Sequence, residues 1–117
     1  DVRNIFALTS ALEHKGAIVV IGRNGREAIE RLNEVDDIDL VLMDVMMPEM
    51  DGYEATVEIR KNPRWRKLPI IAVTAKAMKD DQERCLQAGS NDYLAKPIDL
   101  DRLFSLIRVW LPKMERI

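Results

Sequence analysis

Apolar and polar positions follow two different periods along this chain. Four short apolar runs, at residues 17–21, 40–43, 70–73 and, more weakly, 92–95, are separated by longer segments in which apolar residues recur every three or four positions. The first three runs are rich in β-branched residues. Runs of this kind and length predict strands buried on both faces, as in a parallel sheet under helices.

Five helices are predicted in the remaining segments. Their apolar stripes lie within residues 2–12, 28–32, 55–59, 78–88 and 100–111. Strands that alternate with helices imply right-handed βαβ units. We therefore predict an α/β fold with a doubly wound parallel sheet, formed by residues 1–117 as a single domain.

Four residues indicate where these helices begin and end. Asp51 and Asp99 are suitable N-cap residues for the third and fifth helices, because an aspartate side chain accepts hydrogen bonds from the free N–H groups of the first turn. Gly89 suits the position just past the fourth helix, where a left-handed backbone is common. Pro112 is predicted to end the last helix, since proline cannot continue it.

Size, charge and cysteine content exclude several classes of protein. The 117 residues, 47% of them apolar, suffice for one globular domain with a core. Lys and Arg number 18 against 20 Asp and Glu, so the net charge of −2 gives no reason to expect nucleic-acid binding. The single cysteine, Cys85, allows no internal disulfide, and no apolar run approaches the about 18 residues of a membrane span. We expect a cytoplasmic domain without direct membrane contact, in a parent protein that can itself be membrane-anchored.

Three chemically reactive residues directly follow three of the predicted strands. Asp44 follows the second apolar run, Thr74 the third and Lys96 the fourth. Active residues of open α/β sheets sit at the carboxyl ends of the strands, so these side chains are expected to meet at one edge. A carboxylate can attack phosphorus and form an acyl phosphate, while an ammonium and a hydroxyl can bind the oxygens that gain charge. The pattern therefore favours phosphoryl transfer to Asp44.

Three longer motifs surround these residues. They are MDVMMPEMDGYE at 43–54, PIIAVTA at 69–75 and NDYLAKPID at 91–99. They resemble the phosphoacceptor segment, the switch strand and the lysine-proline segment of response-regulator receiver domains. With DVRNIFALTSALE at the start of the chain, they are most similar to the receivers of hybrid sensor histidine kinases. The resemblance covers nearly the whole chain and implies a flavodoxin-like sheet, which is five-stranded in the family.

The resemblance implies a role for each residue that matches a family motif. Asp44 would accept the phosphoryl group, and Thr74 and Lys96 would each bind one of its oxygens. The backbone carbonyl of Met46 would bind Mg²⁺ together with Asp44, which fits the preference of this ion for oxygen ligands. Tyr93 would occupy the aromatic switch position of the family's fifth strand.

The implied function is that of a phosphoacceptor in a two-component phosphorelay. The phosphoryl group would come from a phosphohistidine on a histidine kinase or on a histidine phosphotransfer domain. Such a domain is not an enzyme, although it can assist its own phosphorylation and dephosphorylation. The family also implies a cis peptide bond between Lys96 and Pro97, a conformation that only a bond before proline adopts at low cost.

Two predicted helices differ in how firmly the sequence ties them to the core. The helix at 78–88 has a thin apolar stripe, so we expect few core contacts and a movable element there. In the last helix, Leu106 and Val109 lie off the buried stripe and are predicted to be available to a partner. A switch surface is therefore expected along these two helices and the strand that carries Tyr93.

One part of the family pattern is absent from this sequence. The family begins with an apolar strand that ends in an acidic pair, which binds Mg²⁺, and Asp1 matches the position just after that pair. We therefore expect a receiver domain that is truncated at its N-terminus, or one whose sheet is completed by a strand-sharing partner. Four buried aliphatic side chains contribute roughly 6–12 kcal/mol, against a whole-domain stability of about 5–15 kcal/mol. A monomer of these residues alone is expected to be unstable.

Two other functions fit part of the pattern. Dehalogenase-type phosphatases also use a strand-end aspartate, but they carry a second aspartate two residues later, where this chain has Met46. The other alternative is a receiver-like interaction module that is not phosphorylated, which stays open for a chain without the acidic pair. Phosphotransfer assays with and without Mg²⁺ distinguish these functions.

Overall fold

A computed structural model describes residues 2–22, 24–35, 37–45, 51–75 and 79–111. The predicted metal ligand Met46, the predicted helix start at Met78 and the predicted helix stop at Pro112 lie outside the described residues. The chain forms two compact parts, which are described separately here: one is Ile21–Ile98, and the other combines Asp1–Val20 with Asp99–Ile117.

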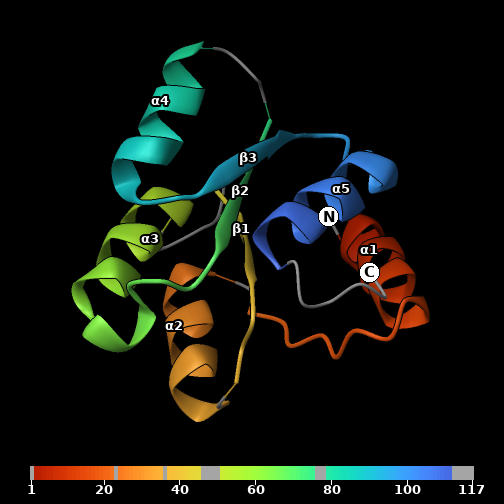
Figure 1. Cartoon of the computed structure of the whole chain (residues 1–117), viewed down its shortest axis with the longest axis horizontal. Coiled ribbons are helices and arrows are strands. Elements are labelled where there is room, and N and C mark those ends of the chain that lie inside the picture. Colours follow the sequence, from red (N-terminus) through yellow and green to blue (C-terminus); the bar gives the residue numbers. More distant parts are fainter. Residues whose placement is uncertain (1, 23, 36, 46–50, 76–78, 112–117) are drawn as a thin grey trace. The chain divides into compact units, whose positions relative to one another are not determined.

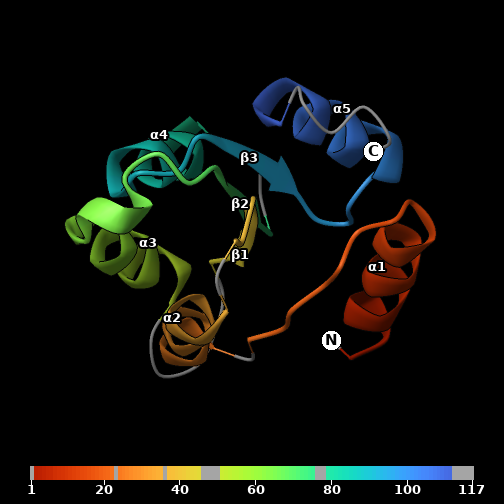
Figure 2. The ribbon, with the colours of Figure 1, turned by 60° about the horizontal axis from the view of Figure 1, so that its bottom comes forward.

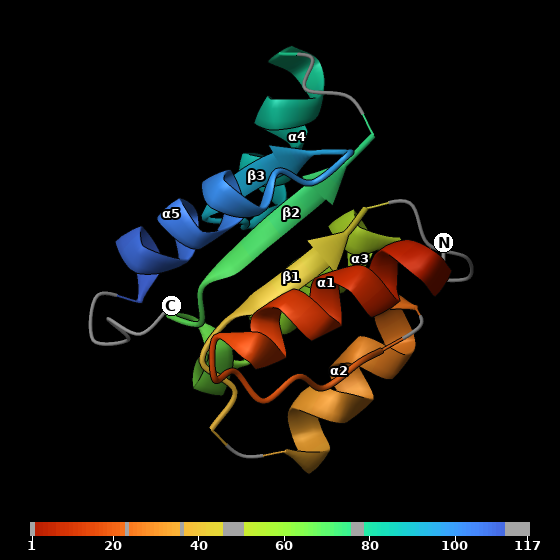
Figure 3. The same cartoon turned by 90° about the vertical axis from the view of Figure 1, so that its right-hand side faces the viewer.

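The larger part contains a parallel sheet. Its strands are β1 (Val41–Asp44), β2 (Ile70–Thr74) and β3 (Asp92–Ala95), in the order β1-β2-β3. All three arrows point the same way in Figure 3. Three of the four predicted strands are therefore confirmed, and the register places their carboxyl ends at one edge of the sheet.

Three helices lie together against one face of this sheet (Figures 1 and 2). They are α2 (Gly25–Glu34), α3 (Gly52–Lys61) and α4 (Lys79–Ala88), and a 3-10 turn, η1 (Pro63–Trp65), follows α3. Between helices and strands lies a buried core made of Leu32, Met43, Ala55, Ile59, Trp65 and Ile70. All five residues of β2 are buried, whereas β1 and β3, at the two edges, are each fully buried at one position.

The helix ends follow the predicted capping. The Asp51 side chain accepts a hydrogen bond of 2.9 Å from the N–H of Glu54 at the start of α3. Gly89, just past α4, has a φ of +118°, which is the left-handed region that glycine tolerates. Asp51 and Gly89 thus mark the start of α3 and the end of α4. The start of α3 at Gly52 determines where this helix meets the end of β1.

The predicted strand at residues 17–21 is wrong. This segment pairs with no described strand, and Ile18 is 95% exposed. An extended segment becomes a strand only when a neighbouring strand satisfies its N–H and C=O groups. The apolar run therefore has strand-forming residues but pairs with none of the strands that the structure describes.

The smaller part contains α1 (Val2–His14) and α5 (Leu100–Trp110). Asp99 caps α5 as predicted, since its side chain accepts from the backbone N–H of Asp101 at 3.0 Å. The buried positions of α5 are Leu103, Phe104 and Ile107, whereas Leu100, at the start of the predicted apolar stripe, is 40% exposed. Among the described residues, no helix has both the length and the apolar character to cross a membrane.

Candidate functional site at the carboxyl ends of the strands

An ion pair between Asp44 and Lys96 stands at the carboxyl edge of the sheet. The Lys96 Nζ donates to Asp44 Oδ2 at 2.7 Å, although 52 residues separate the two in sequence. Asp44 is the last residue of β1, and Lys96 directly follows β3. Both side chains keep more than a third of their surface exposed, so the pair is accessible from solvent and adds little to stability.

Thr74 lies between these two residues in the sheet. It ends β2, its side chain is buried, and its carbonyl accepts a hydrogen bond of 2.8 Å from the backbone N–H of Lys96. In register, Asp44 stands opposite Val73, the residue before Thr74. The structure thus brings the three predicted residues to one edge, a carboxylate with an ammonium beside it and a hydroxyl on the strand between them.

Tyr93 lies within the sheet below this edge. Its half-buried side chain packs against a cluster formed by Val45, Ala72 and Cys85. Val45 directly follows Asp44, so the cluster connects the end of β1 with α4. The Lys96–Pro97 peptide bond is cis.

The residues at this edge suit Mg²⁺ only in part. The Asp44 carboxylate is an oxygen donor of the kind that this ion prefers. Within the described ranges, however, no three acidic, histidine or cysteine side chains come together as a metal-binding group. Met46, the other ligand implied by the family, lies outside the described residues. The described donors therefore amount to one carboxylate, and the acidic pair of the family has no counterpart among them.

Gly52 is a residue of this site that the sequence analysis did not identify. A Cβ atom on Gly52 would lie 2.5 Å from the Asp44 carbonyl oxygen and 2.7 Å from the Cα of Val45. The Gly52 N–H also donates to the Val45 carbonyl, at 3.3 Å, and the buried hydroxyl of Thr56 donates to the Gly52 carbonyl at 2.7 Å. The Asp-Gly pair at 51–52 was a signal for such a close approach. Glycine is needed here because α3 starts directly against the backbone that carries Asp44.

We expect Gly52→Ala to slow phosphorylation of the domain by roughly 10²-fold, since a displacement of about 1 Å at a reacting group can cost that much. The methyl group meets backbone atoms on both Asp44 and Val45, so the end of β1 or the start of α3 has to move. The rate is measured with a small-molecule phosphodonor. Val57→Ala is the control, because Val57 lies on the same helix at a position that is 42% exposed. Equal rates in the Gly52 variant and the wild type would contradict this role.

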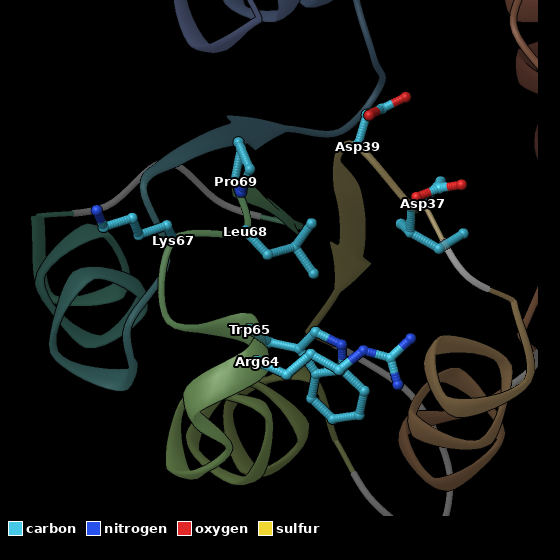
Figure 4. A pocket seen from close by; sticks show the side chains of 8 residues that line it. Asp37, Asp39, Arg64, Trp65, Lys67, Leu68 and Pro69 are labelled. Atoms are coloured by element: carbon cyan, nitrogen blue, oxygen red, sulfur yellow. The ribbon is translucent and has the colours of Figure 1, made fainter.

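A pocket of about 300 Å³ lies at the opposite edge of the sheet, where β1 and β2 begin (Figure 4). Asp37 and Asp39 line it from the segment before β1, and Arg64 and Lys67 from the segment before β2. Trp65 also lines it but is only 7% exposed and belongs to the core. This pocket is therefore separate from the edge that carries Asp44.

Comparison with known proteins identifies the family. A family profile described as "Response regulator receiver domain" matches residues 1–108. The signal transduction histidine-protein kinase BarA of Shigella flexneri is 41% identical over 109 residues, which cover 93% of this chain and 12% of that kinase. The chain thus spans a small part of the length of this relative.

Solved structures agree with the family profile. The receiver domain of the sensor histidine kinase PA1611 from Pseudomonas aeruginosa, solved with a magnesium ion coordinated in its active-site cleft, has a TM-score of 0.85. It is 40% identical, over 96% of this chain and 91% of that chain. A co-crystal of the Saccharomyces cerevisiae phosphotransfer protein Ypd1 with the receiver domain of Ssk1 has a TM-score of 0.87 and 30% identity, over 94% and 82% of the two chains. The predicted flavodoxin-like α/β fold is thereby confirmed, and this chain belongs to the response regulator receiver domains.

Proposed function

We propose that this receiver domain accepts a phosphoryl group on Asp44 from a phosphohistidine. The observation that carries the proposal is the Asp44–Lys96 pair at the strand-end edge, 2.7 Å between Oδ2 and Nζ, with Thr74 on the strand between them. Receiver domains are signalling domains. The residues at this edge indicate how the phosphoryl group would be transferred to Asp44.

The transfer is an in-line displacement at phosphorus. An Asp44 carboxylate oxygen attacks and forms the new P–O bond as the P–N bond to the imidazole of the donor breaks, and the electron pair of that bond stays on the imidazole nitrogen. Negative charge spreads over the three equatorial oxygens. The Lys96 ammonium neutralises one of them, and the Thr74 hydroxyl donates a hydrogen bond to another. Bound Mg²⁺ would supply further positive charge at these oxygens.

Two of the similar proteins indicate the kind of partner. BarA is a histidine-protein kinase, and the Ypd1–Ssk1 structure pairs a histidine phosphotransfer protein with a receiver domain. For this chain we propose the same kind of donor, a histidine kinase or a histidine phosphotransfer domain. The domain would assist its own phosphorylation and dephosphorylation, because Lys96 and Thr74, which would bind the phosphoryl oxygens, belong to the receiver domain and not to the donor.

We also propose how far the domain extends and how its sheet is completed. Residues 1–117 would act as one receiver domain that lacks the first family strand. The free edge of β1 is where that strand would add, since β1 pairs with β2 alone among the described strands. A strand joined before Asp1 or one from a strand-sharing partner would fill this place.

The direct test is phosphotransfer to the full-length protein from a phosphohistidine donor with Mg²⁺, followed by mass spectrometry of the phosphorylated peptide. The expected result is one acyl phosphate per domain, on the peptide that contains Asp44, and labile to hydroxylamine. A full-length protein that folds and receives no label from any histidine donor would favour the alternative, an interaction module that is not phosphorylated.

The metal dependence gives a second prediction. These 117 residues alone should bind Mg²⁺ weakly, because Mg²⁺ gives up its water reluctantly and the described residues offer one carboxylate at the edge. A version with an apolar strand and an acidic pair joined before Asp1 should bind it more tightly. Titration of both proteins with Mg²⁺ measures the difference. Equal affinities would mean that the metal site has been placed wrongly.

A further inference from the structure

The first turn of α3 presents an aromatic ring to α4. Tyr53 directly follows Gly52, whose backbone is packed against the carbonyl of Asp44. The position of Tyr53 is therefore tied to the end of β1, and any shift of that backbone is passed to the ring. The resemblance to receiver domains assigns Tyr53 no role.

Two contacts join this ring to α4. The guanidinium carbon of Arg84 lies 4.3 Å from the centroid of the Tyr53 ring, within the range of a cation–π interaction. The Tyr53 side chain also packs against the buried cluster that contains Cys85. Burial, followed by the nearby Cys85, raises the pKa of Tyr53, so the side chain that faces α4 stays uncharged.

These contacts matter because α4 has little else in the core. All ten residues of α4 are described, and Cys85 is the one that is fully buried. Leu86, the other large apolar residue of the helix, is 49% exposed. Cys85 is therefore the main core contact of α4, and Tyr53 packs against the cluster that contains Cys85 while its ring contacts the neighbouring Arg84.

Cys85 also packs with residues next to the proposed phosphorylation site. Cys85 belongs to a cluster with Val45 and Ala72, against which both Tyr53 and Tyr93 pack. Val45 is the residue after Asp44, so the backbone of the proposed phosphoacceptor and the buried residue of α4 share one set of contacts. A change at Asp44 can thus reach α4 through packed side chains.

We propose that Tyr53 is a positioning residue that couples the occupancy of Asp44 to the placement of α4, through its contacts with Arg84 and Cys85. This inference rests on the proposed phosphorylation of Asp44. With Asp44 unmodified, Tyr53 holds α4 against the sheet. A phosphoryl group on Asp44 changes the packing around Val45 and weakens this hold. If a mutation removes the contact that phosphorylation weakens, phosphorylation should have less effect on α4.

The test is hydrogen–deuterium exchange of the α4 amides in the full-length protein, with and without beryllium fluoride and Mg²⁺, which mimic a phosphoryl group on a carboxylate. In the wild type, the mimic should speed exchange in α4. In Tyr53→Leu, exchange should be faster by roughly fivefold before the mimic is added, which is the factor that a cation–π contact of ordinary strength supplies. The mimic should then have little further effect.

Conservative variants separate positioning from general damage to the fold. Tyr53→Phe keeps the ring and the Arg84 contact, so it should restore most of the response, and Arg84→Gln should reproduce part of the Tyr53→Leu effect without changing the core. Lys79→Gln, which removes a cation from α4 that has no described contact with the ring, should behave as wild type. If Tyr53→Leu or Arg84→Gln leaves exchange and the response unchanged while the wild type responds, the coupling is overturned. If the mimic does not change exchange in α4 of the wild type, and Asp44 also takes no label from a phosphohistidine donor, the phosphorylation proposal is overturned and the coupling with it.

Discussion

The Asp44→Asn variant is expected to lose phosphorylation completely, from one phosphoryl group per domain to background. An amide oxygen cannot displace the imidazole of a phosphohistidine, whereas the carboxylate oxygen is the nucleophile of the proposed transfer. Asparagine has the same shape as aspartate, so the fold should survive. The lost partner of Lys96 is more than a third exposed, and exposed ion pairs contribute at most about 1 kcal/mol.

A carboxylate near the other end of the same strand is a matched control for this experiment. Asp39 lies two residues before β1 and lines the pocket at the opposite edge of the sheet. Asp39→Asn makes the same chemical change and should be phosphorylated like the wild type. Both variants are compared by label incorporation from a phosphohistidine donor and by circular dichroism. Label retained in full by Asp44→Asn, or lost equally in Asp39→Asn, would contradict the assignment.

The largest expected effect on stability comes from Arg60, at the end of α3. Its Nε donates to the Gly89 carbonyl at 2.9 Å, and one terminal nitrogen donates to the Trp65 carbonyl at 2.7 Å. The other terminal nitrogen donates to Asn91 Oδ1 at 2.8 Å, an atom that also accepts from the Ile70 N–H. One guanidinium thus joins the end of α3, the loop before β2 and the turn between α4 and β3. Burial lowers the pKa of Arg60, but these charge-assisted bonds compensate for the lost hydration.

Arg60→Ala should lower the free energy of unfolding by about 2–4 kcal/mol, since several half-buried acceptors lose a charged donor at once. Arg60→Lys should recover only part of this, because an ammonium cannot reach the three acceptors that the planar guanidinium spans. Urea unfolding of the domain, with its first strand supplied, measures both. Arg26→Ala, an exposed arginine on α2, is the control and should change stability by no more than about 0.5 kcal/mol. A loss in Arg60→Ala no larger than in Arg26→Ala would show that the network carries no stability.

Much of the fold was predictable because its signals are local. The strand at Asp92–Ala95 has the predicted bounds, and Asp51, Gly89 and Asp99 stand at the helix ends where their side-chain and backbone chemistry placed them. Arg60 was not predictable in this way. An arginine near the end of a polar helix is usually solvated, and the groups that bind it on the α4–β3 turn lie 29 and 31 residues away in sequence.

The sequence by itself determined the order of the five helices and of the three strands that form, and the residues at or just past the strand ends, Asp44, Thr74 and Lys96. These depend on hydrophobic period and on position relative to a strand end, and both can be read within a few residues. The tertiary structure alone decided that Lys96 reaches Asp44 and that Gly52 lies against its carbonyl, because such contacts depend on how distant segments pack. It also decided that residues 17–21 form no strand. The β-branched residues there favour extended backbone, but a strand needs a hydrogen-bonded neighbour, and no described strand pairs with this segment.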